Sequence, residues 1–96
     1  MPAYVIADVR DVRDPDALIE YRRRNTDAVA AHGGRFLVRG GEATPLEGDW
    51  PTRRIVVMEF PDTAAARAWW ESDAYEAIKP LRRGASDTNI ILVEGA

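Results

Sequence analysis

The chain has 96 residues and a mass of 10.7 kDa, the size of one domain, so we expect a single domain over residues 1–96. Thirteen basic and sixteen acidic side chains leave a net charge of −3, which argues against nucleic acid or an anionic membrane as a partner. The absence of cysteine and the single histidine, His32, exclude disulfides and argue against a metal site or a metal cofactor.

The first half of the chain is predicted to form a strand, a helix and a second strand. Ala3–Val9 is a β-branched run with an aromatic residue, which is typical of a strand. An aspartate followed by a proline then begins a helix over Pro15–His32, and two glycines end it. Arg35–Arg39 is the second predicted strand, and Glu42–Thr52, with two prolines, is a predicted loop.

The second half repeats this pattern in the order strand, helix, strand. Arg54–Phe60 is the clearest strand, and Pro61 with Asp62 begins a helix that continues through Trp70. Ser72 is the expected N-cap of a shorter helix disturbed by Pro80, and Asn89–Glu94 is the last strand. The order predicts an α+β, ferredoxin-like βαββαβ fold with a four-stranded antiparallel sheet.

Two of these strands do not alternate between apolar and polar residues. Ile55–Met58 and Ile90–Val93 are apolar at every position, which predicts that both faces of the sheet are buried. Two helices can cover only one face, so we expect a homodimer whose sheets pack face to face. The alternative is that short strands are apolar on both sides without a partner. No apolar run is long enough to cross a bilayer and no signal peptide begins the chain, so we expect a cytoplasmic protein.

Several segments, in this order and at this spacing, resemble the DUF1330 family. They are 32–41 (HGGRFLVRGG), 46–50 (LEGDW), 57–61 (VMEFP), 68–75 (AWWESDAY), 81–83 (LRR) and 93–95 (VEG). The resemblance implies a dimeric α+β barrel, in which two ferredoxin-like sheets pair, and a family activity that is undefined. Relatives on that fold include cofactor-free monooxygenases, muconolactone-type isomerases and haem-binding enzymes, but the sequence carries none of their catalytic signatures.

Charged residues at strand and helix ends are the first candidates for chemistry. Glu59 ends a central strand, where a carboxylate is a general base or forms an ion pair with Arg39 or Arg82. Arg39 precedes two glycines and suits a bound carboxylate or an interface ion pair. Arg82, with Arg83, offers a second cationic group. The run Arg22–Arg24 is interpreted as a solvated helix surface.

Polar and aromatic residues supply the remaining candidates. Tyr21 and Asn25 share a helix face with His32, whose imidazole is either a general acid or base, or a packed residue at the helix end. Ser72 and Tyr75 are ligand contacts or simply an N-cap and a buried aromatic. Trp50, on the long loop, closes over a ligand or packs on the second subunit.

These residues support two hypotheses. The first is a dimer with a pocket between sheet and helices for a small carboxylate or carbonyl compound, with proton transfer or isomerisation as the favoured reaction and cofactor-free oxygenation next. That pocket is expected to be lined by Tyr21, His32, Arg39, Glu59, Tyr75 and Arg82. The second is a non-enzymatic dimeric module, in which the same residues are interface pairs and helix caps.

Overall fold

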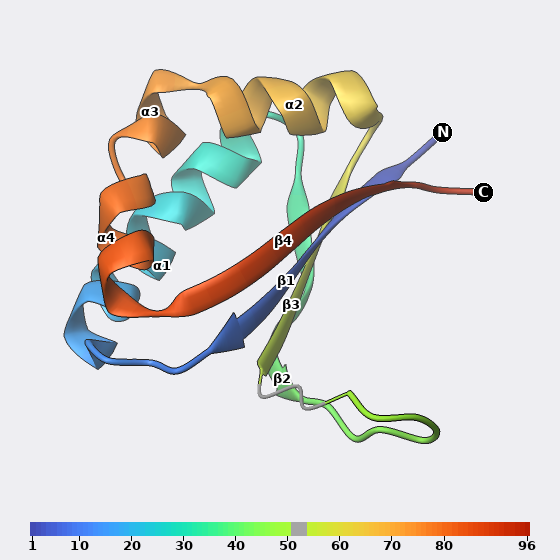
Figure 1. The fold of residues 1–96 in the computed structure, drawn as a ribbon. Coiled ribbons are helices and arrows are strands. Elements are labelled where there is room, and N and C mark those ends of the chain that lie inside the picture. Colours follow the sequence, from blue (N-terminus) through green and yellow to red (C-terminus); the bar gives the residue numbers. More distant parts are fainter. Residues whose placement is uncertain (51–53) are drawn as a thin grey trace.

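The computed structural model describes residues 1–50 and 54–96 and has a layer of helices on one face of a single sheet (Figure 1). Its elements, in chain order, are β1 (Ala3–Arg10), α1 (Pro15–Ala31), β2 (Arg35–Glu42), β3 (Arg54–Phe60), α2 (Thr63–Glu71), α3 (Asp73–Glu76), α4 (Lys79–Ala85) and β4 (Asp87–Glu94). The strands are antiparallel in the order β2-β3-β1-β4. This topology confirms the predicted ferredoxin-like fold.

The structure corrects the predicted bounds at three places. The strand expected at Arg35–Arg39 continues to Glu42 because two register shifts carry its glycines along the edge of β3. The last strand begins at Asp87, two residues earlier than expected. Pro80 lies in the first turn of α4, where its missing N–H has no helical partner to lose, so it begins a helix rather than disturbing one. Residues 51–53 of the predicted loop lie outside the described residues.

Side-chain caps fix the start of each helix that carries the core. Asp14 Oδ1 accepts a hydrogen bond from the Ala17 N–H at 3.1 Å, and Asp62 Oδ1 accepts one from the Ala65 N–H at 2.8 Å. Ser72 Oγ accepts from the Tyr75 N–H at 3.2 Å, as expected of an N-cap. The Ser72 cap separates α2 from α3 and turns the chain so that Tyr75 faces the core.

The core lies between the helices and one face of the sheet. Its largest fully buried side chains are Trp69, Tyr75, Phe60, Ile78 and Val29. The Trp69 and Tyr75 ring centroids are 4.3 Å apart, and the indole Nε1 of Trp69 donates to Asn25 Oδ1 at 3.0 Å. This bond satisfies a buried N–H and ties α2 to α1.

No described helix covers the opposite face of the sheet (Figure 1). Strand pairing puts Val38, Val57, Ile6 and Ile91 in one row across this face. Ile91 is 56% exposed. We call these four residues the apolar row. The apolar row explains why two strands are apolar at every position. Successive residues of a strand alternate between the helix-covered face and the face that carries the row.

The close approach of α1 to Phe60 gives a test of this packing. A Cβ added at Gly34 would lie 2.6 Å from Phe60 Cε1 and 2.7 Å from Val29 Cγ1, whereas one added at Gly84, in α4, would meet nothing within 4 Å. We expect Gly34→Ala to lower the free energy of unfolding by about 1–3 kcal/mol because the core is overpacked. Gly84→Ala should instead raise it by up to about 1 kcal/mol through helix propensity. Urea titration of both variants measures the difference, and equal effects would contradict the described packing.

Candidate functional site

Two adjoining cavities lie between the helix face of the sheet and helices α1 and α4. The outer cavity has a volume of about 430 Å³ and the inner one about 50 Å³. Arg82, Thr88 and Ile90 line both. We call the two together the Arg82 cleft. The inner chamber is closed by Leu18, Phe36, Val56 and Met58, with Tyr21, Arg22, Asn25 and Arg39 as its other polar walls, and the outer mouth adds Trp70, Arg83, Ser86, Asp87 and Asn89.

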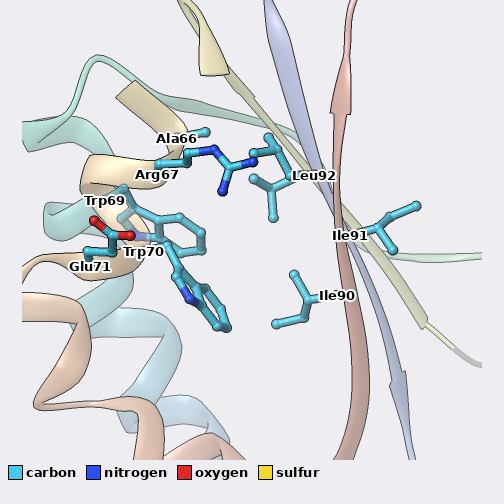
Figure 2. Close-up of a pocket in the computed structure, with 9 residues that line it drawn as sticks. Ala66, Arg67, Trp69, Trp70, Glu71, Ile90, Ile91 and Leu92 are labelled. Atoms are coloured by element: carbon cyan, nitrogen blue, oxygen red, sulfur yellow. The ribbon is translucent and has the colours of Figure 1, made fainter. Parts of the chain in front are cut away.

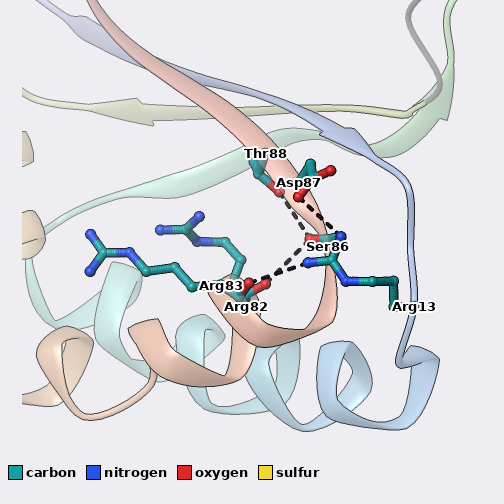
Figure 3. Close-up of polar contacts among 6 residues, drawn as sticks. All are labelled: Arg13, Arg82, Arg83, Ser86, Asp87 and Thr88. Carbon is teal, nitrogen blue, oxygen red and sulfur yellow. Dashed lines mark hydrogen bonds and ion pairs between the residues drawn. The ribbon is translucent and has the colours of Figure 1, made fainter.

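Arg82 is a buried cation for which the described residues provide no counter-charge. The residue is 7% exposed, and its Nε atom is buried with no hydrogen-bond partner. None of the ion pairs among the described residues includes Arg82. Figure 3 shows the contrast with Arg13, whose guanidinium pairs with Asp87 at 3.0 Å. A buried guanidinium N–H without an acceptor, as at Arg82 Nε, costs free energy that a bound anion would recover.

Two buried hydroxyls meet beside Arg82. Tyr21, from α1, and Tyr75, from α3, lie with their hydroxyl oxygens 2.8 Å apart. Burial raises the pKa of Tyr21 and Tyr75 adds to the rise, while the nearby Arg82 guanidinium opposes it. Tyr21 therefore remains a neutral phenol that can donate a hydrogen bond at neutral pH.

Arg39 closes the inner chamber on the side of β2. Its Nη2 donates to the Arg22 carbonyl and to Thr26 Oγ1, both at 2.7 Å, and its guanidinium lies 4.0 Å from the centroid of the Phe36 ring. Desolvation, followed by repulsion from Arg22, lowers the pKa of Arg39, as expected for a cation without a carboxylate neighbour. Arg39 thus connects β2 to α1 and adds positive charge to the chamber wall.

A short hydroxyl network forms the floor of the outer mouth (Figure 3). The Ser86 and Thr88 hydroxyl oxygens are 3.0 Å apart, and Ser86 Oγ donates to the Arg82 carbonyl at 3.4 Å. These bonds hold the turn from α4 into β4, which fixes the backbone of Arg82.

The cleft brings together four of the residues expected at the site. Tyr21, Asn25, Arg39 and Arg82 line the inner chamber. Tyr75 is wholly buried behind Tyr21 and contacts the chamber only through the hydroxyl bond. The sequence signal that found them was helical spacing on α1 together with arginines at element ends.

Glu59 is not part of this cleft, which corrects the expected pairing with Arg39 or Arg82. Strand pairing places Glu59 beside Tyr4 on the face of the sheet away from the helices. Its Oε1 accepts from Arg35 Nε at 2.9 Å. The sequence predicts a strand end at both positions, but alternation directs Glu59 away from the helices, and the bulges of β2 direct Arg39 toward them.

Three further candidates also lie outside the cleft. His32 is the C-cap of α1, where its Nδ1 hydrogen-bonds the Ala28 carbonyl at 2.9 Å. Ser72 is the N-cap described above. Trp50 lies on the other side of the sheet, in an apolar cavity of about 430 Å³ that it forms with Leu46, Ile6 and other residues.

Trp70, Ser86 and Thr88 are cleft residues that sequence reasoning did not assign to the pocket. Thr88 precedes the predicted strand Asn89–Glu94, and alternation puts it on the same face as Ile90 only because β4 begins at Asp87. Trp70 lies on the rim, with the Lys79 ammonium 4.0 Å from its ring centroid. Buried Lys79 also forms an ion pair with Glu76. Its charge is therefore neutralised, whereas that of Arg82, three residues later, is not paired among the described residues.

A second cavity on the helix side lies between α2 and β4 (Figure 2). Its volume is about 170 Å³, and it shares Trp70 and Ile90 with the Arg82 cleft. In Figure 2 the rings of Trp69 and Trp70 lie toward Ile90 and Leu92, and Arg67 extends from α2 toward Leu92. The polar groups here are Arg67 and Glu71, both exposed, so this cavity lacks the buried unpaired charge of the Arg82 cleft.

Within residues 1–50 and 54–96 there is no cluster of three or more metal-ligating side chains. None of the helices described for this chain combines the length and the apolar character that a membrane crossing requires.

The two-layer fold and its cleft define a ferredoxin-like α+β protein. The chain belongs to the DUF1330 family, a domain of unknown function, whose family model matches residues 2–96. No curated protein matches the chain in sequence.

Solved structures with this fold come from several organisms. A protein of unknown function from Rhodopseudomonas palustris is 22% identical, with a TM-score of 0.76 over 99% of this chain and 82% of its own. A dimeric ferredoxin-like protein of unknown function from Jannaschia sp. CCS1 is 13% identical, with a TM-score of 0.74 over 99% of this chain and 100% of its own. SnoaB, a cofactor-independent oxygenase from Streptomyces nogalater in a mutant form, is 13% identical, with a TM-score of 0.59 over 98% of this chain and 92% of its own. At these identities the likeness shows the fold alone.

A buried charge kept for a ligand should cost stability when the ligand is absent. We expect Arg82→Met, which keeps the apolar stem, to leave the free energy of unfolding unchanged or raise it by about 1 kcal/mol. Lys79→Met is the matched control, because that buried cation has a carboxylate and an aromatic partner, and its loss should cost about 1–2 kcal/mol. Denaturant unfolding compares the two. A loss of more than about 2 kcal/mol in Arg82→Met would indicate a structural role instead.

Proposed function

We propose that this protein is a homodimer that binds a small carboxylate in the Arg82 cleft. The observation that carries the proposal is the buried guanidinium of Arg82, whose Nε has no partner among the described residues. Guanidinium and carboxylate groups match in geometry and form charge-assisted hydrogen bonds, which are among the strongest in proteins. Arg39 on the opposite wall adds to the positive potential.

The walls of the cleft favour an organic anion over an inorganic one. The inner chamber is lined by apolar side chains from β1, β2, β3 and β4, namely Ala7, Val9, Phe36, Val56, Met58 and Ile90, and by Leu18 of α1. A ligand with one charged end and a short apolar body would pair with Arg82 and pack against these walls. Small-molecule sites are usually apolar, with a few polar groups that orient the ligand.

The residues that line the Arg82 cleft favour ligand binding over catalysis by proton transfer. Asp87 is the one carboxylate that lines the cleft among the described residues, and it is paired with Arg13. Glu59, the expected general base, lies on the other face of the sheet. A general base must reach the proton that it removes, so Glu59 of the same chain cannot serve this cleft.

The homodimer in this proposal is supported by the apolar row. Val38, Val57, Ile6 and Ile91 would be buried if two sheets packed face to face, which removes apolar surface that one chain leaves exposed. Leu46, 98% exposed on the loop beside this face, and Trp50 would then contact the second copy. Similar structures are described as dimeric, including those from Jannaschia sp. CCS1 and Thermobifida fusca YX.

The dimer is tested by a charge placed on the apolar row. We expect Ile91→Asp to shift the protein to a monomer in sedimentation at micromolar concentration, because the carboxylate would be buried without a partner. Ile19→Asp is the matched control, since Ile19 is 60% exposed but lies on α1, away from this face. A wild-type monomer, or a dimer that survives Ile91→Asp unchanged, would refute the proposed interface.

The binding site is tested by thermal unfolding with 4-methylpentanoate and its neutral amide. At ten times its Kd the carboxylate should stabilise the protein by about 1.4 kcal/mol, which raises Tm by about 5–10 °C, and the amide should have no comparable effect. Arg82→Met should abolish the shift. Arg24→Met should keep it, because Arg24 is exposed on α1 and does not line the cleft. A shift that persists in Arg82→Met would mean that the carboxylate binds elsewhere.

A further inference from the structure

The hydrogen bond between the two tyrosine hydroxyls beside Arg82 has a defined direction. They share one hydrogen bond, so only one of their two protons lies between them. Tyr75 is wholly buried and is absent from the residues that line the cleft, so its proton has Tyr21 as its described acceptor. The opposite arrangement would leave a buried O–H without a partner, at a cost of about 1–3 kcal/mol. Tyr75 therefore donates to Tyr21, and the proton of Tyr21 is free for the chamber.

The hydrogen bond from Trp69 to Asn25 likewise leaves Asn25 with free donor hydrogens. The indole of Trp69 can only donate, so it requires the amide oxygen of Asn25 as its acceptor. The amide nitrogen of Asn25 is left with both hydrogens for another partner. Asn25 is 3% exposed and lines the inner chamber. Two core hydrogen bonds thus consume acceptors and leave donors on the chamber wall.

The inner chamber is therefore rich in donors and cations. Its polar side chains are Tyr21, Arg22, Asn25, Arg39, Arg82 and Thr88, with no carboxylate and no imidazole among the described lining residues. The Ser86 hydroxyl proton goes to the Arg82 carbonyl, so in the Ser86–Thr88 bond the Thr88 hydroxyl is the donor. A carboxylate that pairs with Arg82 through both of its oxygens leaves the Tyr21 proton to a further acceptor, which an oxygen on the neighbouring carbon of the ligand would supply.

We infer that the ligand is a 2-oxo acid, whose carboxylate is held by Arg82 and whose adjacent carbonyl oxygen accepts the free proton of Tyr21. This inference rests on the proposed anion site and adds the class of ligand. A 2-oxo acid is an acceptor at both positions, and Tyr21 and Arg82 line the same chamber. A 2-amino acid is disfavoured, because its ammonium group would lie among arginines with no carboxylate to accept from it.

Three probes with the same carbon skeleton separate these possibilities. They are 4-methyl-2-oxopentanoate, 4-methylpentanoate and L-leucine, with dissociation constants measured by titration calorimetry. We expect the oxo acid to bind about tenfold more tightly than the plain acid, the amount that one hydrogen bond contributes, and leucine to bind at least tenfold more weakly than the plain acid.

Tyr21→Phe is the decisive variant, because it removes the hydroxyl and keeps the ring. It should bring the oxo acid to the affinity of the plain acid and leave the plain acid within about twofold of wild type. Tyr4→Phe makes the same change on the opposite face of the sheet and should preserve the tenfold preference. Should Tyr21→Phe fail to fold because the Tyr75 hydroxyl is orphaned, the double variant Tyr21→Phe/Tyr75→Phe removes that orphan and serves instead.

The outcomes of these titrations test the 2-oxo acid inference separately from the proposed carboxylate site. If both acids bind equally to wild type, or if the preference survives in Tyr21→Phe, the 2-oxo inference is wrong while the carboxylate site stands. If leucine binds as tightly as the oxo acid, the inference is also wrong. If neither acid binds at millimolar concentration, the proposed site itself fails.

Discussion

A sheet that is apolar on both faces, with helices for only one of them, is the constraint on which the rest of this structure depends. The helix layer buries Val5, Met58 and Phe60 on one side, and the apolar row is left on the other. A small domain buries too little surface to leave such a face unused at no cost. The Arg82 cleft lies on the helix side of the sheet, under α1 and α4.

Arg82 is a buried cation that the described residues leave without a counter-charge. The fold buries its guanidinium on α4 without the partner that Lys79, three residues earlier on the same helix, receives from Glu76 and the Trp70 ring. Packing alone does not explain why one of two neighbouring buried cations has a carboxylate partner and the other has none. The difference is understandable if Arg82 is completed by an anion from outside the chain, because binding then offsets the cost of burial.

The sequence was sufficient for the fold, since capping residues, glycine pairs and strand composition are local signals. It was less informative about the site, for a reason visible in Glu59 and Arg39. Both lie at strand ends in the sequence prediction, but the face that each takes depends on alternation in β3 and on two bulges in β2, which arise from strand pairing and not from local sequence. Tyr21 and Asn25 were correctly grouped because helical spacing alone places them on one face.

The core and the cleft are connected through the direction of two hydrogen bonds. Trp69 has only a donor, and Tyr75 has no acceptor other than Tyr21 among the residues described around it, so each imposes a direction on its partner. Asn25 and Tyr21 consequently present donors to the chamber, although neither is charged. The packing of α2 and α3 thus sets the polarity of a site built on α1, α4 and β4. In the ligand site that we propose, a preference for acceptor oxygens would therefore follow from the hydrogen bonds of buried aromatic residues.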